Sequence, residues 1–184
     1  MALKFSLQLP TDRVTDLAEF GTAEAIAEIA RATEAAGFDA SFVTEHPFPT
    51  DEWLGTGGHH ALDPFVSLAL AASATSTLLL HTNILVLAYR NPFLTAKAIA
   101  SLDAVSGGRT IVGVGAGYLE GEFKALGADF ANRNDVSDDA LIAMKAAWTG
   151  ESVSLSKSGF DAAGNTMLPP PVQQPHPPIW VGGN

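Results

Sequence analysis

The stretch LDAVSGGRTIVGVGAGYLEGEF, residues 102–123, decides the fold. Two adjacent glycines, Gly107 and Gly108, follow its first residues, and glycine readily takes the left-handed backbone conformation that ends a helix. Residues 110–114 are mostly apolar or β-branched, which is typical of a strand covered on both faces. The stretch therefore predicts a helix end, a tight turn and a buried strand of a parallel sheet.

Glycines also dominate the exit from this strand. Gly113, Gly115 and Gly117 leave the backbone open to the close approach of a ligand. Glu120 and Glu122 follow at the start of the next predicted helix, where the helix dipole favours carboxylates. We therefore expect the carboxyl end of this strand to form the wall of a pocket.

Strand and helix patterns alternate on both sides of this stretch. Thr22, Asp63 and Asn91 each precede a helical pattern as N-caps, and the last two are followed by proline. Alternating elements with short joints indicate right-handed crossovers and a parallel sheet. The predicted strands are 3–9, 40–44, 78–87, 110–114 and 178–182, the main predicted helices are 23–36, 63–74, 91–105 and 135–148, and 47–61 and 152–164 are predicted as a loop and as a hairpin or loop.

Two α/β architectures fit this alternation, an open doubly wound sheet and a (β/α)8 barrel. The dinucleotide-binding pattern GxGxxG should follow the first strand of a doubly wound sheet, but residues 10–21 do not contain it. In a barrel, the loops after the strands build the site together. We therefore predict an incomplete TIM-type barrel with strands one to five, because the chain has 184 residues and a complete barrel takes about 250.

The composition excludes several classes of function. The formal net charge is -10, and no basic stripe is present that would neutralise nucleic-acid phosphates. Cysteine is absent, which rules out disulfides, thiolate metal sites and a cysteine nucleophile. No apolar run reaches the roughly 18 residues of a membrane span, and no secretion signal is evident. We expect a cytoplasmic protein without a nucleic-acid or membrane partner.

Three segments carry a resemblance to a known family. They are AYRNPFLTAKAIASLDAVSGGRTIVGVGAGYLEGEFKALGADF at 88–130, LPPPVQQPHPPIWVGGN at 168–184 and EHPF at 45–48. Together they resemble the luciferase-like monooxygenase superfamily of flavin and deazaflavin oxidoreductases, in particular its branch that uses coenzyme F420. The resemblance implies a (β/α)8 barrel in which 1–184 form one partial domain and 131–177 are an insertion after strand four.

The resemblance also implies a cofactor site and a reaction. It implies that His46, at the tip of strand two, is the catalytic residue, since imidazole exchanges protons near neutral pH. The implied cofactor is F420, with FMN as the alternative, and its ring would rest against a cis peptide between Asn83 and Ile84. The residues implied to bind the cofactor are Glu45, Asn83, Ile84, Gly115, Gly117, Tyr118, Gly182, Gly183 and Asn184, and no metal is implied.

Several side chains keep two interpretations. His46 is either the acid/base or a loop histidine without a role, and Tyr118 either lines the ring pocket or packs. Arg90 meets either a ligand anion or a neighbouring acid. The partner of Arg133 is left open, and adjacent histidines His59 and His60 alone are weak evidence for metal. Trp148 and Trp180 are expected in the core.

Three functions are compatible with these observations. The first is a flavin or deazaflavin oxidoreductase that transfers hydride between F420 or FMN and a small organic substrate. The second is a shortened, non-catalytic scaffold or cofactor-binding fragment that self-associates to cover its sheet edges. The third is a non-enzymatic interaction module, which the glycine-rich strand ends disfavour. We expect a homo-oligomer, most simply a dimer.

Overall fold

A five-stranded parallel sheet is the centre of the computed structural model, which describes residues 3–182. Its strand order is β1-β2-β3-β4-β7, and every neighbouring pair is parallel. The strands are β1 (Ser6–Gln8), β2 (Ala40–Val43), β3 (Leu79–Val86), β4 (Thr110–Gly115) and β7 (Ile179–Val181). The predicted parallel α/β topology is confirmed, and five strands correspond to part of a barrel.

Helices connect these strands and carry the predicted caps. They are α1 (Ala23–Ala35), α2 (Asp51–Gly55), α3 (Pro64–Ala74), α4 (Pro92–Ser106), α5 (Glu120–Ala125) and α6 (Arg133–Ala147). The side chains of Thr22, Asp63 and Asn91 accept N–H groups at the starts of α1, α3 and α4. Gly107 ends α4 with a φ of 70°, as its place in the sequence predicts.

Two segments differ from the sequence-based expectation. The predicted loop at 47–61 contains α2, because Thr50 caps its first turn by accepting the Trp53 N–H. The joint at 10–21 contains two short helical turns, η1 (Val14–Asp16) and η2 (Leu17–Gly21). The first strand has only three residues, although the apolar alternation extends from residue 3 to residue 9.

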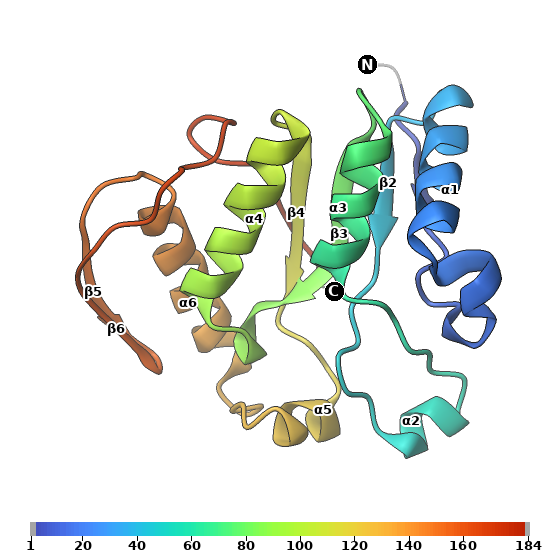
Figure 1. The fold of residues 1–184 in the computed structure, drawn as a ribbon. Coiled ribbons are helices and arrows are strands. Elements are labelled where there is room, and N and C mark those ends of the chain that lie inside the picture. Colours follow the sequence, from blue (N-terminus) through green and yellow to red (C-terminus); the bar gives the residue numbers. More distant parts are fainter. Residues whose placement is uncertain (1–2, 183–184) are drawn as a thin grey trace.

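Helices flank the sheet (Figure 1), and the apolar core lies between the two. One cluster joins β2 and β3 to α1 and α3 through residues such as Ile26, Leu68 and Leu80. A second joins β4 to α4 and α6, with Met144 and Trp148 fully buried. Trp148 therefore lies in the core as predicted, and α6 belongs to the crossover that leads from β4 to β7.

The prediction that Trp180 lies in the core is wrong, because 54% of the residue is exposed. Its ring packs edge-on against His81, with the ring centroids 4.8 Å apart. Both rings line a cavity of about 400 Å³ at the amino-terminal half of the sheet. Phe5 and Leu7, from the region of β1, are exposed as well. Trp180 thus faces away from the helix-covered core.

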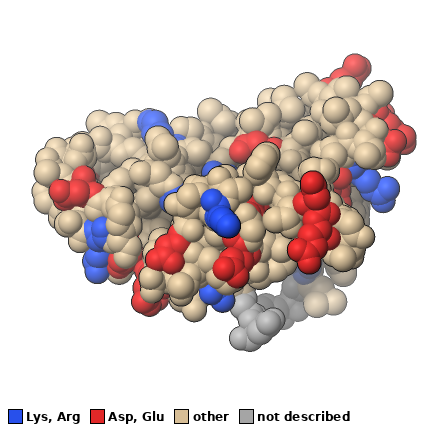
Figure 2. Space-filling model, turned by 90° about the horizontal axis from the view of Figure 1, so that it is seen from below, with Lys and Arg blue, Asp and Glu red and all other residues tan. Residues whose placement is uncertain are grey.

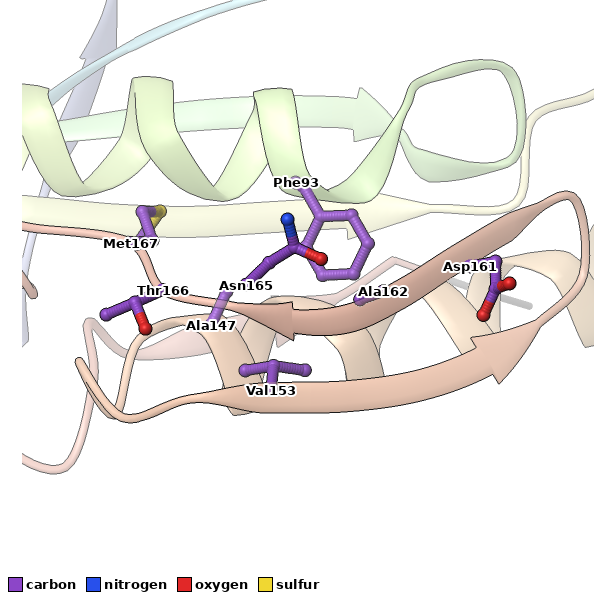
Figure 3. A pocket seen from close by; sticks show the side chains of 8 residues that line it. All are labelled: Phe93, Ala147, Val153, Asp161, Ala162, Asn165, Thr166 and Met167. Atoms are coloured by element: carbon purple, nitrogen blue, oxygen red, sulfur yellow. The ribbon is translucent and has the colours of Figure 1, made fainter.

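A two-stranded antiparallel hairpin, β5 (Val153–Lys157) and β6 (Phe160–Asn165), follows α6. Its side chains and those of α4 and α6 line a cavity of about 300 Å³ (Figure 3). Phe93 of α4 reaches toward the hairpin and meets Phe160 with ring centroids 5.4 Å apart. The hairpin and the proline-rich chain after it are additions beside the β/α repeat.

Candidate functional site

A cavity of about 610 Å³ lies at the carboxyl ends of four sheet strands. This end of the sheet points toward α2 and α5 in Figure 1. Viewed from that side, acidic and basic side chains are interspersed over the surface (Figure 2). The lining residues come from the segments that follow β2 and β4 and from β3, α6 and the end of β7: Thr44, Glu45, His46, His59, Asn83, Ile84, Val86, Gly115, Ala116, Gly117, Tyr118, Arg133, Asn134 and Gly182.

A bulge in β3 forms one wall of this cavity. The register between β3 and β4 shifts between Thr82 and Leu85, and the peptide between Asn83 and Ile84 is cis. The resemblance implied a cis peptide at this position, and the structure contains it. The Thr82 hydroxyl binds both backbone groups of Gly113 at 2.9 and 3.0 Å, which joins the start of the bulge to β4.

The neighbouring strand β3 lies so close to β4 that two glycines of β4 have no room for a side chain. A Cβ at Gly113 would overlap the Thr82 carbonyl oxygen, and a Cβ at Gly115 would overlap the Ile84 side chain. Gly117 has a φ of +83° and lies against Val86 and Phe123. The sequence interpretation assigned this free space to a ligand, but at Gly113 and Gly115 the β3 bulge occupies it. Gly115 and Gly117 still line the cavity beside Ile84.

His46 lies at the cavity wall and contacts a buried acid. Its Nδ1 lies 3.4 Å from Oε2 of Glu122 in the first turn of α5. The other Glu122 oxygen accepts the Phe48 N–H at 3.0 Å. Glu122 is only 2% exposed. The acid next to His46 in space is therefore one that lies 76 residues away in the sequence.

Aromatic rings surround the His46 imidazole. The ring centroids of Trp53, His59 and Tyr118 lie 4.4, 5.0 and 6.3 Å from that of His46. Tyr118 is 65% exposed, so it lines the cavity and does not pack in the core. Trp53 comes from α2, which the sequence analysis treated as loop. The imidazole is confined by these neighbours and keeps one edge toward Glu122.

The Glu45 carboxylate forms hydrogen bonds with other groups of the protein. Its Oε2 accepts the Val86 N–H at 2.9 Å, and its Oε1 accepts the Arg90 guanidinium, with Nε at 2.7 Å. Burial alone would lower the pKa of Arg90, but the hydrogen bond and the charge of Glu45 raise it. Of the two interpretations of Arg90, pairing with a neighbouring acid is the one observed. Glu45 touches the cavity and also anchors the end of β3.

Arg133 also has partners within the protein. Its Nε donates to the Gly117 carbonyl at 3.1 Å, and Nη1 donates to the Phe130 carbonyl at 3.0 Å. The guanidinium lies 4.2 Å from the centroid of the Phe130 ring. Arg133 therefore fixes the glycine turn after β4 to the start of α6.

Of the three expected cofactor-binding residues at 182–184, the structure describes only Gly182. The Gly182 N–H donates to the Val114 carbonyl at 2.8 Å, which extends the pairing of β7 with β4. Gly183 and Asn184 lie outside the described residues. Within residues 3–182, no group of three His, Asp or Glu side chains has metal-binding geometry. None of the helices in that range has the length and apolar character that a bilayer crossing requires.

Glu122 was predicted only as a carboxylate at a helix start, and Trp53 was not predicted as a site residue. Trp53 on α2 and Glu122 on α5 are brought to His46 by loops whose course depends on the whole fold. Trp53 had a local signal, because Thr50 and two acids stand before it as in a capped helix. Glu122 had none that linked it to His46.

The comparisons with known proteins agree on one family. The sequence pattern of the family described as luciferase-like monooxygenase matches residues 3–184. The F420-dependent hydroxymycolic acid dehydrogenase of Mycobacterium tuberculosis is 30% identical over 158 residues, which cover 84% of this chain and 42% of that protein. The FMNH2-dependent dimethylsulfone monooxygenase of Pseudomonas putida is 34% identical over 97 residues, which cover 51% of this chain and 27% of that protein.

A solved structure is also similar to this chain. The crystal structure of monooxygenase RslO1 from Streptomyces bottropensis matches with a TM-score of 0.84 and 28% identity, covering 97% of this chain and 53% of that one. In all three alignments the chain spans about half of the relative's length or less. Because the family pattern covers nearly the whole chain and the fold agrees, the chain belongs to the luciferase-like monooxygenase family.

Proposed function

We propose that the protein is an oxidoreductase that uses F420 or FMN and exchanges hydride with a small organic substrate. The observation that carries this proposal is the His46–Glu122 pair, at 3.4 Å, on the wall of the cavity at the strand ends. Carboxyl ends of parallel barrel strands are where sites of this fold are built. Family membership and the names of the relatives support both cofactors.

The cavity suits a planar ring. Its volume of about 610 Å³ lies within the range of roughly 300–1,000 Å³ that small-molecule sites show. The Ile84 bulge and the backbone at Gly115 and Gly117 supply an apolar wall for such a ring, with Ala116 and Tyr118 beside it. A bound F420 or FMN supplies the hydride chemistry that this chain's own side chains lack.

His46 handles the accompanying proton in this proposal. In the oxidation direction, the substrate loses a hydride, with two electrons, to the cofactor and a proton to the imidazole; reduction reverses both transfers. Trp53 and Tyr118 are placed to exclude water from the imidazole. The proposal includes a cytoplasmic protein that acts as a homodimer without nucleic-acid or membrane partners.

Titration with each cofactor tests this function. Fluorescence of F420 and of FMN would be followed as the protein is added, and quenching with saturation by one of them supports the proposal. Replacing the acid/base, His46→Asn, should leave that binding within a few-fold and slow turnover of alcohol or ketone substrates by about 10²- to 10⁴-fold. Absence of binding by both cofactors would refute the proposal.

A non-catalytic scaffold that self-associates is the second candidate, and the exposed apolar side chains of Phe5, Leu7 and Val181 favour it. Light scattering combined with the same titration separates the candidates. Association together with weak cofactor binding and no turnover supports the scaffold, whereas turnover that His46→Asn removes supports the enzyme.

A further inference from the structure

We propose that Glu122 is a positioning residue that selects the tautomer of His46 and leaves Nε2 as the nitrogen that exchanges the proton with the substrate. The assignment of the tautomer stands on the contacts of the apo protein. The role of Nε2 toward the substrate rests on the proposed function.

The contacts of Glu122 determine where the imidazole hydrogen lies. Its carboxylate is buried and has one oxygen for each of two neighbours, the Phe48 N–H at 3.0 Å and His46 Nδ1 at 3.4 Å. The oxygens of an ionised carboxylate only accept hydrogen bonds, so in this pair Nδ1 carries the hydrogen that points at Oε2. The neutral imidazole then has its lone pair on Nε2.

Nε2 is the nitrogen left for the reaction. Nδ1 and Nε2 lie at separate positions of the ring, so the contact with Glu122 occupies only Nδ1. No residue within 3–182 forms a hydrogen bond with Nε2. The imidazole lies at the cavity wall, and the Trp53 and His59 rings limit its rotation. The Nδ1–H tautomer therefore presents a proton acceptor, and the imidazolium presents a proton donor, at Nε2.

Phe48 makes the substitution Glu122→Gln informative. The Phe48 N–H is a donor and would repel the NH2 group of a glutamine, so the amide oxygen of the glutamine should take the place of Oε1. The amide NH2 then faces His46 Nδ1 and must be accepted there. Glutamine has the same shape as glutamate, but it presents a donor to Nδ1 where the carboxylate presents an acceptor. The hydrogen of His46 should therefore move from Nδ1 to Nε2.

Nitrogen and carbon NMR of labelled imidazoles reads the tautomer directly. The chain has five histidines, and the signal that disappears in His46→Asn identifies His46. At alkaline pH, where imidazoles are neutral, we expect the Nδ1–H form in the wild type and the Nε2–H form in Glu122→Gln. Glu120→Gln removes a charge from the same helix turn at an exposed position and should leave the Nδ1–H form unchanged.

An Nε2–H form in the wild type, or the same tautomer in the wild type and a folded Glu122→Gln, would overturn the assignment. Circular dichroism melting checks that each variant is folded. This result does not depend on cofactor binding, so the tautomer assignment can stand when the titration with F420 and FMN fails. For the substrate step, we expect Glu122→Gln to lower kcat by up to the roughly 10²- to 10⁴-fold that an acid/base contributes, with KM nearly unchanged. Unchanged kcat in a variant whose tautomer has switched would overturn the role of Nε2.

Discussion

Gly113 shows how one residue connects the sequence motif to the site. The Thr82 hydroxyl holds both backbone groups of Gly113, and the Thr82 carbonyl lies where a Cβ at residue 113 would be. The bulge at Asn83 and Ile84 begins next to this contact. A side chain at 113 would therefore disturb the cavity wall as well as the core.

We predict that Gly113→Ala destabilises the protein by about 1–3 kcal/mol or more, because the added methyl group overlaps a backbone atom that cannot rotate away. The denaturant midpoint measures this loss. Gly55→Ala is the matched control, since a Cβ at Gly55 meets no atom within 4 Å. Equal denaturant midpoints for the two variants would contradict the close packing of β3 against Gly113.

Residue-level predictions succeeded where the interaction is local in sequence. The capping roles of Thr22, Asp63 and Asn91 depend on N–H groups two or three residues away. The pairing of His46 with Glu122 spans 76 residues and depends on where two loops end. No local pattern encodes such a contact, so it required the structure.

At the scale of elements, Glu34 of α1 joins that helix to the turn before β3. Its Oε1 accepts the N–H groups of Ser76, Thr77 and Leu78 at 2.9, 2.6 and 2.9 Å. These bonds, that of Thr77 foremost, lower the pKa of Glu34 from 4.5 to about 2. The contribution of the carboxylate to stability is therefore complete above pH 4.5 and is lost as the pH falls toward 2.

We predict that Glu34→Gln lowers the free energy of unfolding at neutral pH by about 1 kcal/mol or less, a small value because solvent screens this site. The difference from the wild type should shrink as the pH is lowered below 4.5. Urea unfolding at a series of pH values measures it. A difference that stays constant from pH 7 down to the acid limit would contradict the role of the ionised carboxylate.

Arg109 organises a second junction, at the amino-terminal edge of the sheet. Its guanidinium donates to the carbonyls of Ala72, Thr75, Leu78 and Ser106 at 2.7 to 3.1 Å. These carbonyls lie at the ends of α3 and α4 and at the start of β3, where helical hydrogen bonding leaves acceptors free. One side chain therefore satisfies the ends of three elements.

We predict that Arg109→Lys lowers the free energy of unfolding by about 1–3 kcal/mol, because an ammonium group cannot reach all of these acceptors and leaves some of them unsatisfied. Thermal unfolding measures the change. Arg31→Lys on the exposed side of α1 is the control and should be nearly neutral. A neutral Arg109→Lys would mean that water replaces the guanidinium at this junction.

The order of elements was predictable because each β/α unit has its own apolar period and caps. Helix α2 was not predicted, since the surrounding proline and glycine indicated a loop, although Thr50 caps it. Trp180 was expected in the core, but 54% of it is exposed. Burial of β7 depends on which chain segments lie next to it, which the local sequence does not specify.

At the scale of the whole molecule, the sheet has one face packed by helices and a cavity at the carboxyl ends of its strands. The helix-covered face contains the two core clusters. The carboxyl ends of the strands contain the cavity with His46, Glu122 and the β3 bulge. This cavity is lined from β3, β4 and the end of β7, which are far apart in the sequence, so its shape depends on the fold as a whole.

A comparative cofactor titration of the wild type, Ala116→Phe and Ala35→Phe tests directly whether the cavity at the strand ends binds the cofactor. Ala116 lines the cavity, whereas Ala35 lies exposed on α1. We predict that the wild type and Ala35→Phe bind F420 or FMN with the same affinity, and that Ala116→Phe weakens binding about tenfold or more, equivalent to about 1.4 kcal/mol. Equal affinity in all three folded proteins, or no binding of either cofactor to the wild type, would contradict the account.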